Sequence, residues 1–450
     1  MTLRTHIAVL LLALGALSAA AGGVTLHAAF RSGLNASPFP NANHRFSVFV
    51  PDSYDPATPA CLYVGLDGEL CRASEVIDSL ITAGKMPVTI CVFLQPGVIE
   101  DDDGNVVRYN RSNEFDATTP EFADMLEMII YQSLEAIPLP DGRQIRISRN
   151  GADHMIFGLS SGGIAAFVAA WHRPDLFQRV FSGVGTFVAM RGGNDLQAIV
   201  RKNEPKPLRV FLQDGTADVW NPLFGHWYEG NRMLASALDF AGYDTRYDWG
   251  EGGHNVNRAT EIFAQVMEWM WRDWPQPIPT GHTQNDLLAA LLPAEGSQWI
   301  LTGETASVSR PAQYSAVNAT GQIIVTPSPT SNRLNQEIVY RGQKSMKQPF
   351  YWLHTLDNGL VNVGPMAFDS NGNLWVSTEW GIQICDQNGR VRGILSWPAP
   401  EFASKTVLPL ALEIRQGSIR LTDSRSRVWT RTLNVKPAVK GVRPTSQGQG

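Results

Sequence analysis

A serine flanked by glycines stands where an apolar run meets an alanine-rich run. Gly158, Ser160 and Gly162 form a G-x-S-x-G pattern, with mostly apolar residues at 154–159 and an alanine-rich stretch at 163–171. A strand, a sharp turn and a helix in that order make a nucleophile elbow, which exposes a strained serine hydroxyl. The pattern therefore predicts Ser160 as a nucleophile. A simple glycine-serine turn between a strand and a helix is the alternative interpretation.

A serine hydroxyl becomes a good nucleophile when an imidazole accepts its proton and a carboxylate orients that imidazole. His254 follows a predicted strand at 245–249, through a glycine-rich loop. Two acids follow a predicted strand at 207–213: Asp214 ends the strand directly, and Asp218 lies one turn further along. We favour Asp218 because its loop could reach back to His254. The side chain of Asp214 could instead fix the turn.

A reaction at a carbonyl group also needs two backbone N–H groups that stabilise the negative charge developing on the oxygen. We expect the N–H of Ser161, directly after the nucleophile, to be one of them. The second is expected in the loop after a predicted strand at 61–66, where Gly68 is the candidate.

Three further residues are candidates for substrate binding. Arg111 and Glu114 lie in an irregular, acidic loop, and Trp220 follows Asp218 closely. The ring of a tryptophan such as Trp220 or Trp227 can stack on a sugar or an aromatic group. An internal salt bridge would explain the presence of Arg111 and Glu114 in this loop about as well as substrate binding does. For a tryptophan, packing in the core or at its rim is the more common role.

The elements that must position these residues alternate along the first part of the chain. Predicted strands cover 45–50, 61–66, 87–94, 177–184, 207–213 and 245–249, and predicted helices cover 74–82, 120–136, 225–242 and 260–274. This alternation predicts an α/β fold with a parallel sheet and helices on both faces. Because the carboxyl ends of parallel strands meet at one edge, Ser160, Asp218 and His254 should gather there.

An apolar run near the N-terminus and a proline-rich stretch in the middle of the chain indicate where its domains begin and end. Arg4 and His6 precede an apolar run at 7–17, and alanines at 19–21 offer a cleavage site, so residues 1–23 are predicted to be a signal peptide. Residues 275–281 are rich in proline, which predicts a stiff linker. We place an α/β-hydrolase domain at 24–275, the linker at 276–282, a second domain at 283–434 and a disordered tail at 435–450. The mature protein is expected to be secreted or periplasmic.

The second domain shows a weak repeat. Gly321, Gly372 and Gly417 occupy turns between strand-like runs and are spaced 51 and 45 residues apart. Such spacing suits the four-stranded blades of a β-propeller. Only three or four blades fit in this space, so we expect an all-β, propeller-like domain that is incomplete, degenerate or completed by a partner.

Composition argues against several classes of function. The net charge of -5 gives no indication of nucleic-acid binding. After the signal peptide, no segment is apolar over enough residues to span a bilayer. The four cysteines have no C-x-x-C spacing, which argues against a metal cluster or thioredoxin chemistry. We expect neither a metal nor a cofactor.

Residues from about 40 to 275 resemble the putative-esterase family of α/β-hydrolases, which includes enterochelin esterases, feruloyl esterases and esterase D. The stretches that carry the resemblance are 109–116, 158–163, 173–180, 210–218 and 249–255. The resemblance implies that Ser160 is the nucleophile, His254 the base and Asp218 the acid. It also implies hydrolysis of carboxylic esters, often of acyl groups on sugars, although some relatives are acyltransferases.

The stretch 368–391 is similar to the SMP-30/gluconolactonase family of six-bladed propellers. That family holds a divalent cation through scattered Glu, Asn and Asp residues. A full ligand set cannot be mapped onto this chain, so a binding or structural role is the favoured interpretation of the second domain.

We therefore expect an exported serine carboxylic-ester hydrolase that acts on a small-molecule or carbohydrate ester. Two alternatives belong to other classes. One is a metal-dependent sugar lactonase that acts through the propeller region. The other is a non-catalytic carbohydrate- or partner-binding protein built on a hydrolase fold.

Overall fold

The computed structural model of the 450-residue chain describes residues 22–34, 38–357 and 359–444. Nearly all of the expected signal peptide and residues 445–450 of the expected tail lie outside the described residues. The chain divides into two compact units, of which the first comprises Met1–Gln197 and Lys206–Gly281. The second comprises Ala198–Pro205 and His282–Gly450. The division after Gly281 falls in the expected linker, whereas the assignment of residues 198–205 to the second unit was not predicted.

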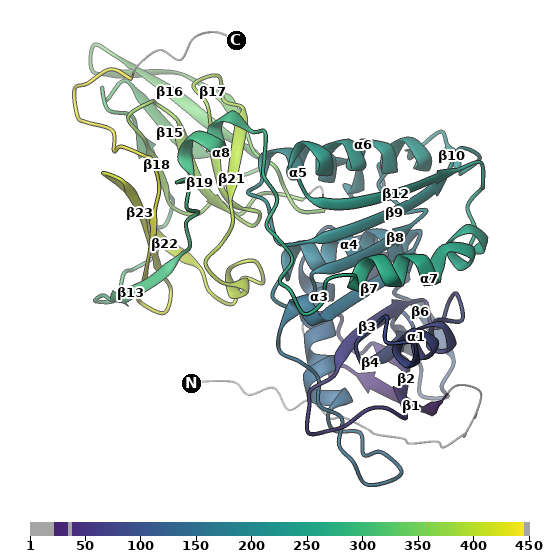
Figure 1. Ribbon diagram of the computed structural model, residues 1–450. Coiled ribbons are helices and arrows are strands. Elements are labelled where there is room, and N and C mark those ends of the chain that lie inside the picture. Colours follow the sequence, from purple (N-terminus) through teal and green to yellow (C-terminus); the bar gives the residue numbers. More distant parts are fainter. Residues whose placement is uncertain (1–21, 35–37, 358, 445–450) are drawn as a thin grey trace. The chain divides into compact units, whose positions relative to one another are not determined.

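The first unit is built on a ten-stranded sheet in its described residues (Figure 1). Six parallel neighbours form most of it, in the order β12 (Asp244–Gly250), β9 (Arg209–Gly215), β8 (Arg179–Gly183), β7 (His154–Leu159), β3 (Cys61–Leu66) and β4 (Thr89–Leu94). Antiparallel strands extend the sheet beyond β4, namely β2 (Asn43–Pro51), β5 (Val98–Glu100) and β6 (Val106–Tyr109), and β1 (Gly23–Arg31) pairs with β2. The predicted parallel sheet is confirmed, with an antiparallel edge that the sequence did not predict.

Helices cover both faces of this sheet. On one face, α1 (Ala73–Thr82) and α7 (Asn257–Trp271) pack on alternate strand residues such as Phe157 and Phe181. On the other face, α4 (Ser161–His172) brings Gly163 against Ser182, and α6 (Trp227–Phe240) brings Asn231 to Asp214. This unit also holds α2 (Arg111–Phe115) and α3 (Glu121–Met128), whereas most of α5 (Leu196–Lys202) belongs to the second unit.

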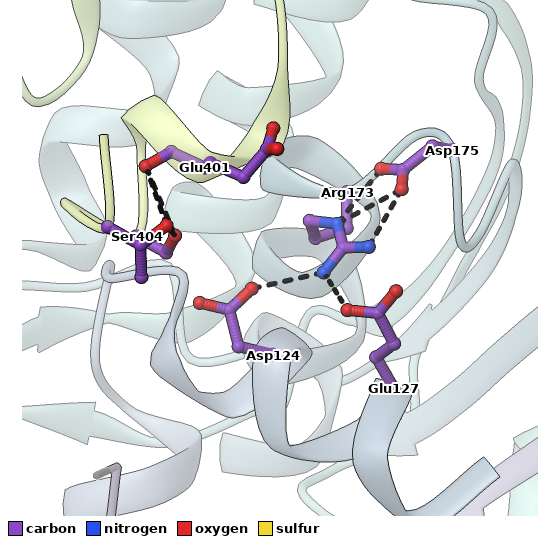
Figure 2. Close-up of polar contacts among 7 residues, drawn as sticks. Asp124, Glu127, Arg173, Asp175, Glu401 and Ser404 are labelled. Carbon is purple, nitrogen blue, oxygen red and sulfur yellow. Dashed lines mark hydrogen bonds and ion pairs between the residues drawn. The ribbon is translucent and has the colours of Figure 1, made fainter. Parts of the chain in front are cut away.

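A buried arginine joins α3 to the end of α4. The side chain of Arg173, directly after α4, is only 5% exposed. Figure 2 shows its guanidinium between three carboxylates: Asp124 at 3.1 Å, Glu127 at 2.9 Å and Asp175 at 2.7 Å. Because a buried cation is tolerated only when it is paired and hydrogen-bonded, these acids fix the position of the α4 end.

The second unit is mostly β, as expected. It holds α8 (Asp286–Leu291) and three four-stranded antiparallel sheets in its described residues. The first sheet contains β14 (Ala316–Val317), β15 (Ile323–Pro327), β16 (Arg333–Tyr340) and β17 (Gln343–Trp352). The second contains β18 (Met366–Phe368), β19 (Leu374–Thr378), β20 (Gly381–Cys385) and β21 (Val391–Leu395). The third joins β13 (Ile300–Glu304) to β24 (Arg427–Thr432), β23 (Ser418–Asp423) and β22 (Pro409–Arg415).

The three turn glycines of the weak repeat take comparable places in these sheets. Gly321, Gly372 and Gly417 each lie in the turn between two consecutive, paired strands, namely β14 and β15, β18 and β19, and β22 and β23, and have φ values of 71°, 78° and 75°. A left-handed φ of this kind favours glycine because it carries no Cβ. Within 282–357 and 359–444, the structure shows separate four-stranded sheets and not a propeller.

The expected disordered tail begins differently from the prediction. Val435 is buried, and Pro437 forms a β-bridge with Asp369. The N–H of Gly441 donates to the carbonyl of Ala319 at 2.7 Å. The first part of the expected tail is therefore held to the second unit at Val435, Pro437 and Gly441, whereas Val439 and Val442 are exposed.

Candidate active site

Ser160 lies at the turn between β7 and α4, with φ 58° and ψ -122°. A non-glycine residue rarely adopts a positive φ, so this backbone is strained. The turn closes only because its glycines are small. A Cβ at Gly158 would lie 2.3 Å from the carbonyl carbon and oxygen of Gly162. The local geometry is therefore that of a nucleophile elbow.

His254 and Asp218 reach Ser160 from two neighbouring strand ends. Nε2 of His254 lies 2.8 Å from Oγ of Ser160, and Nδ1 of His254 lies 2.6 Å from Oδ1 of Asp218. Asp218 follows β9 and is 6% exposed, and His254 follows β12. The sequence-predicted nucleophile, base and acid thus form one continuous line of hydrogen bonds.

The imidazole of His254 is hydrogen-bonded to Asp218 and not to Asp214, and Asp214 interacts with Asp218. Its carboxyl is fully buried, and its two oxygens accept hydrogen bonds from the Gly215 N–H and from Nδ2 of Asn231, both at 2.7 Å. Burial, followed by the hydrogen bond to Asp218 and the negative charge there, raises the pKa of Asp214 to about 9. Asp214 is therefore neutral near pH 7 and can donate a proton to the second oxygen of Asp218.

The same contact acts in the opposite direction on Asp218. Burial by itself favours the neutral form of Asp218, but hydrogen bonds from His254 and Asp214 outweigh it and lower the pKa of Asp218. The two acids that the sequence left as alternatives thus differ in charge. Asp218 is the carboxylate beside the imidazole, and Asp214 is its neutral neighbour.

Of the two backbone N–H groups expected to stabilise the oxyanion, that of Ser161 is free of an intrahelical partner and that of Gly68 is already used. Ser161 is the first residue of α4, so its N–H is one of the donors that a helix leaves without an intrahelical partner. The N–H of Gly68 instead donates to the carbonyl of Leu94 at 3.0 Å. Gly68 is therefore wrong as a donor to the reacting oxygen, because the pairing of β3 with β4 already uses its N–H.

The two charged candidates for substrate binding, Glu114 and Arg111, differ in exposure. Glu114 is 1% exposed, and its oxygens accept from His44 Nε2 and from the Gly97 N–H, both at 2.9 Å. It is wrong as a substrate-binding residue, because it lies inside the fold. Arg111 is partly exposed and holds Asp67 through two hydrogen bonds of 2.7 and 2.8 Å. The internal salt bridge left open by the sequence is thus present at Arg111.

Trp220 remains at the surface. It lies in β10 (Trp220–Asn221), which pairs with β11 (Gly225–His226), and it is 66% exposed. Its position two residues after Asp218 places it on the loop that carries the acid. A ring so exposed is available for stacking on a ligand.

Residues 37–267, more than half of the chain, match the family model described as "Putative esterase". The chain belongs to this family. It is accordingly a serine carboxylic-ester hydrolase, which agrees with the class expected from the sequence. No curated protein matches this esterase in sequence.

Solved structures similar to the esterase are distant from it. A ferulic acid esterase has 17% sequence identity and a TM-score of 0.39, covering 56% of this chain and 99% of its own. The enterobactin esterase FES from Shigella flexneri has 19% identity and a TM-score of 0.42, covering 57% of this chain and 60% of its own. FphF, a fluorophosphonate-binding serine hydrolase from Staphylococcus aureus, has 14% identity and a TM-score of 0.39, covering 56% of this chain and 99% of its own. At these values the likeness bears on neither activity nor substrate.

Thr186, which the sequence did not predict, and Trp227, which it offered as a stacking residue, both lie near the nucleophile of the esterase. The hydroxyl of Thr186 lies 3.5 Å from Oγ of Ser160, and Nε1 of Trp227 donates to that Thr186 hydroxyl at 3.2 Å. The Trp227 ring also meets the His254 ring edge-on, with centroids 6.0 Å apart. Trp227 is 7% exposed, so it packs behind the histidine instead of facing a ligand. No motif marks Thr186, since only its place after β8 brings it to the elbow.

In the described ranges, no group of three or more His, Cys, Asp or Glu side chains could hold a metal ion. All four cysteines are free and buried, namely Cys61, Cys71, Cys91 and Cys385. Among the helices of the described residues, none combines the length and the apolar character that crossing a membrane needs.

Proposed function

We propose that Ser160, His254 and Asp218 are the catalytic triad of this esterase. The observation that carries the proposal is the pair of hydrogen bonds, 2.6 and 2.8 Å long, that joins Asp218 through His254 to the strained Ser160. Because Asp218 accepts from Nδ1 of the imidazole, Nε2 is left to accept the hydroxyl proton. The carboxylate also stabilises the imidazolium that forms.

In the proposed reaction, Oγ of Ser160 attacks the ester carbonyl carbon while Nε2 of His254 takes the hydroxyl proton. The Ser161 N–H stabilises the oxyanion from the N-terminus of α4, together with N–H groups of the turn after β3 other than that of Gly68. The intermediate then expels the alcohol, which takes the proton from His254, and the acyl group stays on Ser160. His254 next deprotonates a water molecule, which attacks the carbonyl carbon of the acyl-enzyme. The bond from that carbon to Oγ of Ser160 then breaks, Oγ takes the proton back from His254, and the acid is released.

We further propose that the substrate is an ester of a carbohydrate or a related small molecule. The exposed Trp220 ring, two residues from Asp218, supports a substrate with a flat face or a sugar ring. Arg111 stands at the carboxyl end of the sheet with a partly exposed guanidinium and can contact a polar part of that substrate.

The location and the second unit complete the proposal. The charged start, apolar run and small residues of 1–23 support export to the periplasm or the medium. Three four-stranded sheets with glycine turns in comparable places support blade-like units of an incomplete propeller. A binding role suits such a unit, since the triad lies wholly in the first unit.

Replacement of the nucleophile tests this function. We expect Ser160→Ala to lower kcat/KM for p-nitrophenyl acetate by more than about 1,000-fold, because triad members act as a unit. Ser79→Ala, the same change at an exposed position of α1, serves as the matched control and should leave the rate unchanged. Turnover that survives in Ser160→Ala would refute the serine mechanism. Lactone hydrolysis that EDTA abolishes in both proteins would indicate the metal-dependent lactonase instead.

A further inference from the structure

A groove of about 660 Å³ lies in the first unit beside β1 and β2. It is lined by residues of these two strands, the end of β4 and the turn after β3. Pockets that bind small molecules occupy about 300–1,000 Å³, so this groove is large enough for a ligand. None of the residues assigned to the triad lines it.

The strand register explains the lining. His27 pairs with Ser47, and Ser47 pairs with Phe93, so these three side chains form a row on one face of the sheet. The next row includes Arg45 and Gln95, whose backbones are joined by a 2.9 Å hydrogen bond from the Gln95 N–H. His27, Arg45 and Gln95 are exposed, so this part of the face is open to solvent.

The topology places the groove at the catalytic edge. Because β2 runs antiparallel to β4, the first residues of β2 lie beside the carboxyl end of β4, at the edge where Ser160 follows β7 (Figure 1). Along the sheet, β4 is two strands from β7, and β1 is four strands away. At about 4.8 Å per strand, the groove extends from about 10 to about 19 Å from the strand of the nucleophile. A group attached to an ester bond at Ser160 has to span this distance to reach the groove.

The turn after β3 connects the groove to the elbow. Gly68 has a φ of 86°, and a Cβ there would lie 2.3 Å from Nε2 of Gln95. The missing side chain thus lets the Gln95 amide lie over the turn. On the other side of the turn, Asp67 approaches Gly162, which lies in the first turn of α4. A Cβ added to Gly162 would be 3.2 Å from Oδ2 of Asp67.

The two charged side chains that line the groove, Arg45 and Glu69, already have hydrogen-bond partners within the protein. Arg45 contacts Glu100 at 2.6 Å, and Oε1 of Glu69 accepts from the backbone N–H of Ser74 at 3.0 Å. The hydrogen-bonding groups of Ser47, Gln95 and a neutral His27 can each both donate and accept. Ligand hydroxyl groups do the same, whereas an anion or a purely apolar chain would leave these groups unmatched.

We propose that this groove binds the neutral, hydroxyl-rich part of the ester, a saccharide, while Ser160 attacks its acyl group. The proposal rests on the proposed function, because it uses Ser160 as the point from which the ligand extends. It assigns Ser47 and Gln95 to specificity and not to the chemical step.

Two variants test the groove. Gln95→Leu removes an exposed amide, and Ser47→Phe fills the space between His27 and Phe93. The readout is the ratio of kcat/KM for 6-O-acetylglucose to kcat/KM for p-nitrophenyl acetate. We expect this ratio to fall about tenfold in Gln95→Leu and further in Ser47→Phe, since each lost hydrogen bond of this kind weakens binding about fivefold or more. Gln276→Leu, an exposed glutamine after α7, is the control and should leave the ratio unchanged.

A ratio within twofold of the wild type in both groove variants would overturn the proposal. So would a loss confined to methyl ferulate, because it would show that the groove takes an aromatic acyl group. If Ser47→Phe does not fold, as judged by circular dichroism, Gln95→Leu alone decides the question. Failure of the proposed function is recognised separately, since turnover of p-nitrophenyl acetate would then survive in Ser160→Ala.

Discussion

The carboxyl of Asp214 is hydrogen-bonded to that of Asp218, and the two have opposite pKa shifts. Burial, the hydrogen bond and the neighbouring charge raise the pKa of Asp214 to about 9, whereas bonds from His254 and Asp214 lower the pKa of Asp218. Near neutral pH the pair therefore holds one proton, on Asp214. This proton lets Asp218 stay charged beside His254 although it is buried.

The first prediction concerns this proton. Asp214→Asn keeps a donor toward Asp218 and one of the two oxygens that accept from Gly215 and Asn231, so kcat/KM for p-nitrophenyl acetate should stay within about threefold of the wild type. Asp214→Leu has a similar volume but no donor, so kcat/KM should fall by about 10- to 100-fold. Steady-state kinetics across pH 5–9 checks both variants. An Asp214→Leu enzyme with the wild-type rate and pH profile would show that the proton does not matter.

The second prediction concerns stability. Because the pKa of Asp214 is raised on folding, its contribution to stability is fully present below about pH 4 and is lost as pH rises through about 9. The wild type should therefore lose stability relative to Asp214→Asn by up to about 1.4 kcal/mol per pH unit in this range. Urea unfolding of both proteins at pH 5, 7 and 9 measures the difference. A difference that grows with pH in favour of the wild type would contradict the assignment.

The third prediction tests the glycine of the elbow. A Cβ at Gly158 would lie 2.3 Å from backbone atoms of Gly162, which cannot move without opening the turn. We expect Gly158→Ala to destabilise the protein by about 3 kcal/mol or more and to abolish most of its esterase activity. Gly33→Ala, where a Cβ meets nothing within 4 Å, is the control. Equal melting temperatures for the two variants would show that the close approach is absent in solution.

The fourth prediction concerns the buried Arg173. Arg173→Met leaves the carboxylates of Asp124, Glu127 and Asp175 without their shared cation, so unfolding should become easier by about 3–5 kcal/mol. Arg72→Met removes an exposed arginine that pairs with Glu75 and should leave stability almost unchanged, because solvent screens an exposed ion pair. Thermal unfolding compares them. Similar losses in both variants would mean that burial does not strengthen the Arg173 network.

Sequence alone could predict the sheet and the three residues that line up on it. Ser160, Asp218 and His254 each follow a recognisable strand. The carboxyl ends of parallel strands lie at the same edge of the sheet, whatever the conformation of the connecting loops. The fold could therefore be derived from alternation, and the candidate triad from the places where strands end.

What the sequence could not predict depends on contacts between distant segments. Gly68 was expected to donate to the oxyanion, but its N–H meets the carbonyl of Leu94 in the neighbouring strand. Glu114 was a candidate for substrate binding, but it is buried against His44, 70 residues earlier in the chain. Thr186 and Trp227 carry no motif, and only the packing of α6 and the exit of β8 brings them to Ser160 and His254.

The most direct test of the account is covalent labelling of the nucleophile. A fluorophosphonate should react with the wild-type protein to give one adduct, which peptide mass spectrometry should locate on Ser160. No adduct should form on Ser160→Ala, and labelling of Asp218→Asn should be at least about 100-fold slower, because His254 loses its orienting carboxylate. An adduct on another serine would contradict the central claim. So would wild-type protein that hydrolyses the ester but does not react with the fluorophosphonate.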